Sequence, residues 1–375
     1  MNSFIFDVTE LQGMKIAILG TRGIPNNHGG FEQFAEYLSQ YLIIKGHKVY
    51  VYSSHSHPFQ KATWKGISIL HKYDPEQRIG TFGQFIYDFN CIVDSRRRDF
   101  DIILQLGYTS SSIWGWLLPK NAVVITNMDG LEWLRAKYSP MVRRFLKFAE
   151  WMAIKTSNYL IADSIGIQEY LRSNYSSKSY YIPYGAELFS APSELILNKY
   201  QIVPFNYSLL IARLEPENNI EVILQGFVAS RSSSELLIVG KHNTSYGRYL
   251  KRKFEKYNNI QFLGGIYDIN HLNNLRYFSN LYFHGHSAGG TNPSLLEAMA
   301  SNALIVAHDN IFNRSILGGD AFYFTKPEEV ANHFSKKKED YYHLIENNRR
   351  KIEKYFQWEA INKSYESFMI ECTGA

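Results

Sequence analysis

Residues 280–307 constrain the fold more than any other part of the chain. Two short apolar runs flank a glycine-rich turn and a segment with helical spacing, so the order is strand, turn, helix and strand. Thr291 or Asn292 has the side chain of a helix cap, and Pro293 suits the first helical position, where its missing N–H costs nothing. We therefore predict a helix that begins directly behind a flexible turn.

The start of this helix has the features of a phosphate-binding site. A capped helix behind a turn presents backbone N–H groups and the positive end of the helix dipole to a ligand. Glu297 follows one helical turn later, where a carboxylate could accept two hydrogen bonds from a ribose. We interpret the stretch as the donor half of a nucleotide-sugar site. The predicted donor-binding residues are Gly30, Asn218, His286, Gly290, Thr291, Asn292 and Ser294.

The rest of the chain alternates strands with helices. The 375 residues are enough for two domains, and the alternation, which restarts after residues 183–187, predicts parallel sheets with right-handed crossovers. We predict an α/β protein of two Rossmann-like doubly wound domains facing a cleft, residues 14–186 and 187–352, with a helix in 353–375 that packs back on the first domain. The expected strands are 14–19, 48–53, 67–71, 101–106, 122–126, 159–162, 179–182, 207–211, 235–239, 260–263, 280–283 and 303–307, and the expected helices include 31–45, 82–93, 140–156, 165–173, 220–228, 245–256, 269–276, 293–300 and 358–370.

Composition excludes several classes of protein. The net charge of +5 is not concentrated in a stripe with stacking aromatics, which argues against nucleic-acid binding. No apolar run approaches the roughly 20 residues of a membrane span, and residues 1–13 do not resemble a signal peptide. Cys91 and Cys372 lie far apart, which is typical of a reducing cytoplasm. The pairs beginning at His55 and His284 lack neighbouring cysteines or paired carboxylates, so we expect no metal and no cofactor beyond the substrate.

A second glycine-rich loop, residues 20–30, follows the first strand. Its glycines suggest phosphate contact, and Gly29-Gly30 leads straight into a helix. The spacing is not Gly-x-Gly-x-x-Gly and no acidic residue ends the second strand, so a dinucleotide-binding domain is poorly supported. Anion binding at a flexible lip of the cleft is the favoured interpretation, and a merely long loop is the alternative.

Arg213 lies just past the first strand of the second domain. A guanidinium in this position can hold a pyrophosphate bidentately, and such a charge-assisted contact contributes roughly 1.5–3 kcal/mol. The alternative is a surface ion pair with Glu215 or Glu217.

Asp129, Glu132 and Arg135 follow a strand of the first domain, where the floor of a cleft is expected. Asp129 could orient an acceptor hydroxyl or stabilise positive charge that develops at a sugar carbon. Because Asp-Gly is a common turn dipeptide, a purely structural turn is the alternative. Glu132 and Arg135 are predicted to bind the acceptor.

A basic amphipathic segment follows. Arg135, Lys137, Arg143, Arg144, Lys147 and Lys155 are accompanied only by Glu150 as an acid, and apolar residues interleave with them. This pattern is typical of a helix at an anionic membrane surface, here residues 139–156, although core packing explains the apolar stripe equally well.

Four ordered motifs together resemble the retaining GT-B glycosyltransferases with a Glu-x7-Glu motif, and more narrowly bacterial rhamnosyltransferases of capsule, O-antigen and cell-wall polysaccharide synthesis. They are Gly20-Thr-Arg-Gly-Ile-Pro25 with Gly29-Gly30-Phe-Glu32, Asp129-Gly-Leu-Glu-Trp133, Arg213-Leu-Glu-Pro-Glu-Asn-Asn219, and the stretch from His284 to Glu297. The resemblance implies two Rossmann-like domains, a nucleotide-sugar donor on the second, an acceptor on the first, and no bound metal.

The chain departs from the broad pattern twice. The first Glu of Glu-x7-Glu falls on Gly289, so a contact to the donor sugar must come from elsewhere or be absent. The lysine expected after the arginine falls on Asn218, which removes one cation from the pyrophosphate. The second Glu is retained as Glu297.

The resemblance implies transfer of rhamnose from dTDP-rhamnose to a lipid-linked sugar or growing glycan. Arg213, Thr291 and Asn292 would hold the leaving pyrophosphate, Glu297 the ribose and Asp129 the acceptor. We expect a cytoplasmic enzyme, peripheral on the inner face of the membrane. A sugar-nucleotide epimerase, which acts without an acceptor, and a nucleotide-sugar-binding protein without turnover are the alternatives.

Overall fold

The computed structural model describes residues 13–27, 29–135, 138–287 and 289–374. The chain forms two compact units. The first comprises Met1–Met128, Ala149–Ile161 and Asn362–Ala375, and the second Asp129–Phe148 and Ala162–Ile361. The predicted division fell at residues 186 and 187, so the structure gives the second unit several segments that we had assigned to the first.

A mostly parallel sheet has strand order β3-β4-β2-β1-β5-β6-β7-β8; β1 to β6 and most of β7 lie in the first unit, whereas β8 falls among the residues of the second. Only β3 and β4 pair antiparallel among the registered pairs, and β1 pairs with both β2 and β5. Strand β1 is an almost completely buried apolar run, as expected for a parallel sheet covered on both faces. The strands are β1 (Lys15–Leu19), β2 (Lys48–Ser54), β3 (Thr63–Trp64), β4 (Ile67–Lys72), β5 (Ile102–Leu106), β6 (Val123–Asn127), β7 (Tyr159–Ala162) and β8 (Tyr180–Tyr181).

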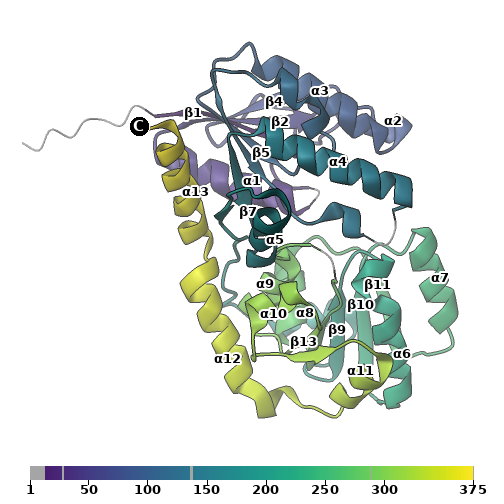
Figure 1. Cartoon of the computed structure of the whole chain (residues 1–375). Helices are drawn as coiled ribbons and strands as arrows, with labels where there is room; N and C mark the ends of the chain where they lie inside the picture. Colours follow the sequence, from purple (N-terminus) through teal and green to yellow (C-terminus); the bar gives the residue numbers. More distant parts are fainter. Residues whose placement is uncertain (1–12, 28, 136–137, 288, 375) are drawn as a thin grey trace, which may run out of the picture. The chain divides into compact units, whose positions relative to one another are not determined.

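The C-terminal helix α13 (Trp358–Thr373) packs on helix α1 (Gly30–Ile44), as Figure 1 shows. Glu366 of α13 accepts a hydrogen bond from the Tyr41 hydroxyl at 2.9 Å and lies 3.2 Å from the ring of His47. The other helical elements before residue 160 are α2 (Glu76–Ile79), α3 (Phe82–Ser95), η1 (Ser112–Leu117), η2 (Glu132–Leu134) and α4 (Pro140–Thr156).

The second unit contains a fully parallel sheet with strand order β11-β10-β9-β12-β13-β14. This is the doubly wound order 3-2-1-4-5-6, in which the direction of winding changes between β9 and β12. Ligands of such sheets bind at the carboxyl ends of the strands at this change, so the fold itself points to the loops after β9 and β12. The strands are β9 (Tyr207–Ile211), β10 (Glu235–Val239), β11 (Ile260–Gly264), β12 (Leu281–His284), β13 (Ile305–His308) and β14 (Phe322–Phe324).

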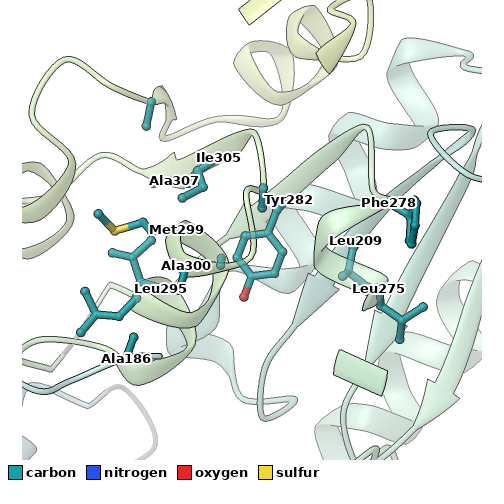
Figure 2. Packing of buried hydrophobic residues seen from close by; sticks show 14 of the residues in the cluster. Ala186, Leu209, Leu275, Phe278, Tyr282, Leu295, Met299, Ala300, Ile305 and Ala307 are labelled. Carbon is teal, nitrogen blue, oxygen red and sulfur yellow. The ribbon is translucent and has the colours of Figure 1, made fainter. Parts of the chain in front are cut away.

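Helix α9 (Pro293–Ala300) is anchored to this sheet by its apolar face. Leu295 and Met299 are fully buried, and Figure 2 shows them beside Tyr282, Ile305 and Ala307 of the strands. Burying two such side chains contributes roughly 1.5–3 kcal/mol each, so the start of α9 has a fixed place relative to β12. The other helical elements are α5 (Ile165–Tyr175), η3 (Glu194–Tyr200), η4 (Pro216–Asn218), α6 (Ile220–Ser230), α7 (Ser245–Phe254), α8 (Ile269–Tyr277), α10 (Ile311–Leu317), α11 (Pro327–His333), η5 (Lys338–Tyr341), α12 (Tyr342–Lys351) and η6 (Ile352–Phe356).

The predicted fold class is confirmed, and the predicted strands and helices recur with shifts of a few residues at their ends. Across the described residues, no helix has the length and apolarity that a membrane span requires.

Candidate active site

The loops that follow β9 and β12 are joined by hydrogen bonds. Ser287 donates from its backbone N–H and its hydroxyl to the carbonyl of Glu217, at 3.1 and 2.7 Å. The amide of Asn219 donates to the carbonyl of Gly285 at 2.8 Å. A Cβ on Gly285 would lie 2.0 Å from the carbonyl oxygen of Asn218, so only glycine allows this approach. The predicted pyrophosphate arginine and the predicted donor turn therefore belong to one site.

Helix α9 starts as predicted, with Asn292 as its cap and Pro293 at its first position. The side-chain and backbone oxygens of Asn292 accept hydrogen bonds from the first helical turn. Ser294 N–H donates to Asn292 Oδ1 at 3.0 Å, and Leu295 N–H donates to the backbone carbonyl of Asn292 at 3.0 Å. The unpartnered donors lie earlier. Within the described residues, the backbone N–H groups of Gly289 and Gly290 have no hydrogen-bond partner. The N–H groups without a partner therefore lie in the turn and not in the first turn of the helix.

Two of the predicted donor-binding side chains are buried and already engaged. The hydroxyl of Thr291 donates to the backbone carbonyl of Asp163. The amide of Asn218 donates to the backbone carbonyl of Arg213 at 2.7 Å. Both side chains therefore shape the two loops, and the contact of Thr291 and Asn218 with a donor stays a prediction.

The glycine turn is enclosed by two segments of the same compact unit. A Cβ on Gly290 would lie 1.9 Å from Oδ1 of Asp163, and a Cβ on Gly130 would lie 2.8 Å from the Cα of Gly289. The glycine turn thus lies between Asp163, which follows β7, and the Asp129-Gly130 segment, which follows β6. Side chains at Gly130 or Gly290 would push these segments apart.

Glu297 has a partner that sequence analysis did not find. Arg276 of α8, which is 1% exposed, donates to Glu297 Oε2 at 2.5 Å and to Ser294 Oγ at 3.3 Å. Ser294 also lies 2.8 Å from the hydroxyl of Tyr282, so its side chain supports this pair. The guanidinium fixes the orientation of the carboxylate, and the side chain of Glu297 remains 18% exposed and accessible to a ligand.

The cations of the site differ in their surroundings. Arg213 is exposed and makes no ion pair with any described residue, so the alternative of a pair with Glu215 or Glu217 is not observed. Arg135 instead lies 2.5 Å from Glu132 Oε1 and 3.7 Å from Glu217 Oε1. The two predicted acceptor-binding residues are thus paired with each other, and Arg213 is the cation left for a ligand.

Asp129 has the turn conformation that sequence analysis offered as the alternative, and its role toward an acceptor stays a prediction. Its φ of 45° is that of a turn. The pKa of its carboxyl is raised to about 6, because burial and the charge of Glu132 raise it more than the charges of Arg135 and Arg213 lower it. A carboxyl that titrates near neutral pH in such a position is able to accept a hydrogen bond from an acceptor hydroxyl.

His284 and His286 stack at 4.4 Å between ring centroids and at 18°. Burial, followed by the charges of Arg213 and Arg135, lowers the pKa of His286 to about 3, and the pKa of His284 lies well below its usual value. Both rings are therefore neutral at pH 7. The backbone carbonyl of His286 accepts hydrogen bonds from the amides of Asn310 and Asn313 at 3.0 and 3.1 Å, which hold the turn.

Gly30, the remaining predicted donor-binding residue, starts helix α1 in the other compact unit. The loop before it is held by carboxylates of that helix. Glu32 accepts from the backbone N–H of Arg22 at 2.7 Å, and Glu36 accepts from that of Asn26 at 2.7 Å. An acid in the first turn of α1 disfavours an anion there, so local structure does not support anion binding at Gly30.

The basic segment does not present one face. Lys147 lies over the rings of Trp133 and Tyr170, 4.2 and 4.8 Å from their centroids, and Glu150 is buried. Arg135 is paired with Glu132, so the prediction of a common basic surface is wrong for Arg135 and Lys147. Lys137 lies outside the described residues. Five of the exposed residues of α4 instead form a stripe of helical spacing: Met141, Arg144, Phe148, Trp151 and Lys155.

Three residues of the site were missed. Asp163 directly follows strand β7, just as Asp129 follows β6, so the rule that selected Asp129 would have selected it. Glu217 was considered only as a partner of Arg213. Arg276 stands next to the buried Leu275 in a helix, and a lone arginine on an apolar face is a signal for a buried ion pair. Within the described residues, no group of three or more His, Cys, Asp or Glu is placed to hold a metal ion.

Comparison with known proteins agrees with this arrangement. Residues 194–357 match the family model "Glycosyl transferases group 1", and residues 120–187 match "Domain of unknown function (DUF1972)". A search of curated protein sequences gives no match. The first match covers most of the second compact unit, including Arg213, the turn and helix α9.

Solved structures of similar fold include sucrose-phosphate synthase from Thermosynechococcus elongatus, with 16% identity and a TM-score of 0.78 over 96% of this chain and 98% of that chain. HepE from Anabaena, solved with UDP and glucose, has 17% identity and a TM-score of 0.74 over 96% and 100%. The catalytic domain of starch synthase IV from Arabidopsis thaliana, bound to ADP and acarbose, has 13% identity and a TM-score of 0.67 over 97% and 100%.

The fold is that of the GT-B glycosyltransferases, with two Rossmann-like domains. The family match and the fold together support a glycosyltransferase of group 1.

Proposed function

We propose that the protein transfers rhamnose from dTDP-rhamnose, with retention of configuration and without a metal ion, to a lipid-linked sugar or a growing polysaccharide. One observation carries the proposal: unpartnered N–H groups at Gly289 and Gly290 occur together with the unpaired guanidinium of Arg213 and the oriented carboxylate of Glu297. These groups match the phosphates and the ribose of a nucleotide-sugar, and they lie within the region that matches the group 1 family.

The donor would bind to Arg213, the turn and Glu297. Arg213 and the turn N–H groups would hold the pyrophosphate, and Glu297, held by Arg276, would accept from the ribose hydroxyls. HepE has been solved with UDP, with UDP-glucose, and with UDP and glucose, so a protein of this fold binds a nucleotide-sugar. The choice of dTDP and rhamnose rests on the four sequence motifs.

The transfer step would need positioning and not a protein nucleophile. The acceptor oxygen forms a bond to the anomeric carbon while the bond from that carbon to the phosphate oxygen breaks, and a phosphate oxygen of the leaving dTDP takes the acceptor proton. Asp129 would orient the acceptor hydroxyl, and Arg213 with the turn would stabilise the charge on the leaving group.

A panel of nucleotide-sugars tests the proposal. Binding and hydrolysis are measured with dTDP-rhamnose, dTDP-glucose, UDP-glucose and GDP-mannose, with and without EDTA. We expect dTDP-rhamnose to bind and react best and EDTA to leave the rate unchanged. A preference for another donor would refute the assigned sugar, and a strict metal requirement would refute the metal-independent reaction.

Two alternatives predict different results in the same panel. An epimerase would convert the donor sugar without any acceptor. A binding protein without turnover would bind a donor and never release free nucleotide. The engaged side chain of Asn218, where the related pattern has lysine, is the observation that keeps the second alternative open.

We also propose that the exposed stripe of α4 attaches the enzyme to the inner face of the cytoplasmic membrane. Arg144 and Lys155 flank the exposed side chains of Phe148 and Trp151 at helical spacing, which suits an interfacial helix. Charge reversal of both basic residues should lower sedimentation with phosphatidylglycerol vesicles. The same reversal at Lys251 and Arg252, exposed on α7, is the control, and equal binding by both variants would contradict the proposal.

A further inference from the structure

The turn that would bind the donor phosphates has no carboxylate of its own for the sugar. The related family has an acidic residue where this chain has Gly289, so a contact to the transferred sugar is missing from the turn itself. In a nucleotide-sugar the transferred sugar is attached directly to the phosphate. A group that replaces the missing acid must therefore lie against the same turn, on another segment of the chain.

Asp163 is in that place. Its carboxyl group would be only 1.9 Å (Oδ1) and 2.4 Å (Oδ2) from a Cβ built on Gly290, so it is in contact with the backbone of the turn. Its own backbone carbonyl accepts the hydroxyl of Thr291, the residue that follows the turn. Gly290, the glycine next to the acid, has no side chain that would have to move when a ligand enters.

The carboxyl of Asp163 is not satisfied by the protein. The residue is 7% exposed, and Oδ1 has no hydrogen-bond partner among the described residues. The backbone N–H groups of Thr291 and of Asp163 itself act on the carboxyl, which explains only part of its hydrogen-bonding capacity. A buried carboxyl with an unused oxygen is unfavourable for folding, and such groups recur where a ligand completes the hydrogen bonds.

A buried carboxyl that faces a second acid also suits a hydroxyl ligand. Burial and then the charge of Asp129 raise the pKa of Asp163 well above its ordinary value. A protonated carboxyl donates one hydrogen bond and accepts others, and a sugar hydroxyl does the same.

We propose that Asp163 is a specificity-determining residue for the donor, whose carboxyl group binds a hydroxyl of the transferred sugar in place of the acid missing at Gly289. The inference rests on the proposed function, because it requires a nucleotide-sugar on the turn. Glu297 would recognise the ribose on one side of the phosphates, and Asp163 the transferred sugar on the other.

Asp163→Asn tests the proposal, because asparagine keeps the shape and loses the acid. Affinities for dTDP and for dTDP-rhamnose are measured by calorimetry in both proteins. We expect dTDP to bind within about twofold of the wild type and dTDP-rhamnose to bind about 3- to 10-fold more weakly, as the loss of a hydrogen bond between neutral groups predicts. Equal changes for both ligands, or none, would overturn the assignment. Glu150→Gln, a buried carboxyl beside Tyr108 in the other compact unit, should leave the ratio of the two affinities unchanged.

A crystal structure of the wild-type protein with unreacted donor is the second arm and does not depend on the folding of a variant. A sugar hydroxyl within about 3.2 Å of an Asp163 carboxyl oxygen supports the proposal, and a bound sugar whose hydroxyls all lie farther than about 4 Å overturns it. If the wild type prefers another nucleotide-sugar, the same measurements are made with that donor, so an error in the sugar is distinguished from an error in Asp163. If it binds none, the proposed function fails, and this inference fails with it.

Discussion

Each unit contains a glycine-rich loop that leads from a buried strand into a helix, residues 20–30 before α1 and residues 285–292 before α9. In the first, the backbone N–H groups of Arg22 and Asn26 donate to Glu32 and Glu36 of the following helix. In the second, the helix is capped by the amide of Asn292, and no acid occupies its first turn.

The difference shows that glycine content does not define an anion site. Both loops have glycines next to a helix start, and both invite a phosphate when the sequence alone is considered. Two backbone donors of the first loop are bound by acids of its own helix, whereas Gly289 and Gly290 of the second have no partner within the described residues. Available donors, and not flexible backbone, decide which loop can bind a phosphate.

Glu297→Ala should have the largest effect. Transfer is lost with the ribose contact, and the free energy of unfolding falls by about 3–5 kcal/mol, because Arg276 remains buried without its partner. Urea unfolding and a transfer assay measure the two effects. Glu36→Ala removes an acid from the helix after the first loop and should cost only about 0.5–1.5 kcal/mol with transfer intact. A Glu297→Ala protein as stable and active as Glu36→Ala would contradict the assigned site.

Gly290→Ala and Gly29→Ala compare one glycine near the helix start in each loop. At Gly290 the new methyl group meets the carboxyl of Asp163, whereas at Gly29 the nearest atom is 3.5 Å away, at ordinary contact distance. We expect Gly290→Ala to lose about 1–3 kcal/mol of stability, by overpacking, and to lower donor affinity at least about tenfold. Gly29→Ala should change neither, as thermal unfolding and calorimetry would show. Equal losses of stability and donor affinity in the two variants would contradict the closer packing described at Gly290.

Arg213→Ala and Arg22→Ala compare the arginines of the two loops. Arg213 is exposed and unpaired, whereas Arg22 lies 2.8 Å from a carboxylate oxygen of Glu76. Loss of the Arg213 contact should weaken dTDP binding by about 1.5–3 kcal/mol, whereas Arg22→Ala should leave dTDP binding nearly unchanged. Calorimetry at two salt concentrations is the measurement. Weaker dTDP binding by Arg22→Ala than by Arg213→Ala would place the phosphates at the first loop.

Sequence analysis predicted the fold and the donor turn because both depend on local patterns. Buried strands, helical spacing and the Asn292-Pro293 cap are properties of neighbouring residues. It did not find Asp163 or Arg276, whose roles depend on contacts between segments far apart in the sequence. It also assigned a ligand to the side chain of Thr291, since a sequence does not show that a hydroxyl is already engaged.

Asp88 and Asp129 extend the comparison to pH. The pKa of each carboxyl is raised to about 6, chiefly by burial. For Asp88 in the first unit, the hydroxyl of Ser110 lowers the pKa and so offsets part of this rise, because it donates to Oδ2 at 2.5 Å. An acid with a raised pKa stabilises the fold below its unfolded value of 3.8, and this contribution is lost as the pH rises through about 6. Asp88→Asn should therefore lose less stability than the wild type between pH 4 and pH 7, by on the order of 2–3 kcal/mol.

Transfer should follow Asp129 instead, because only its ionised carboxyl accepts a hydrogen bond from the acceptor at both oxygens. The rate at saturating donor should rise through about pH 6 in the wild type and equally in Asp88→Asn, since Asp88 belongs to the other unit. Rates from pH 5 to pH 8 with both proteins are the measurement. A rise that disappears in Asp88→Asn would assign the titration to the first unit and remove Asp129 from the role of orienting the acceptor.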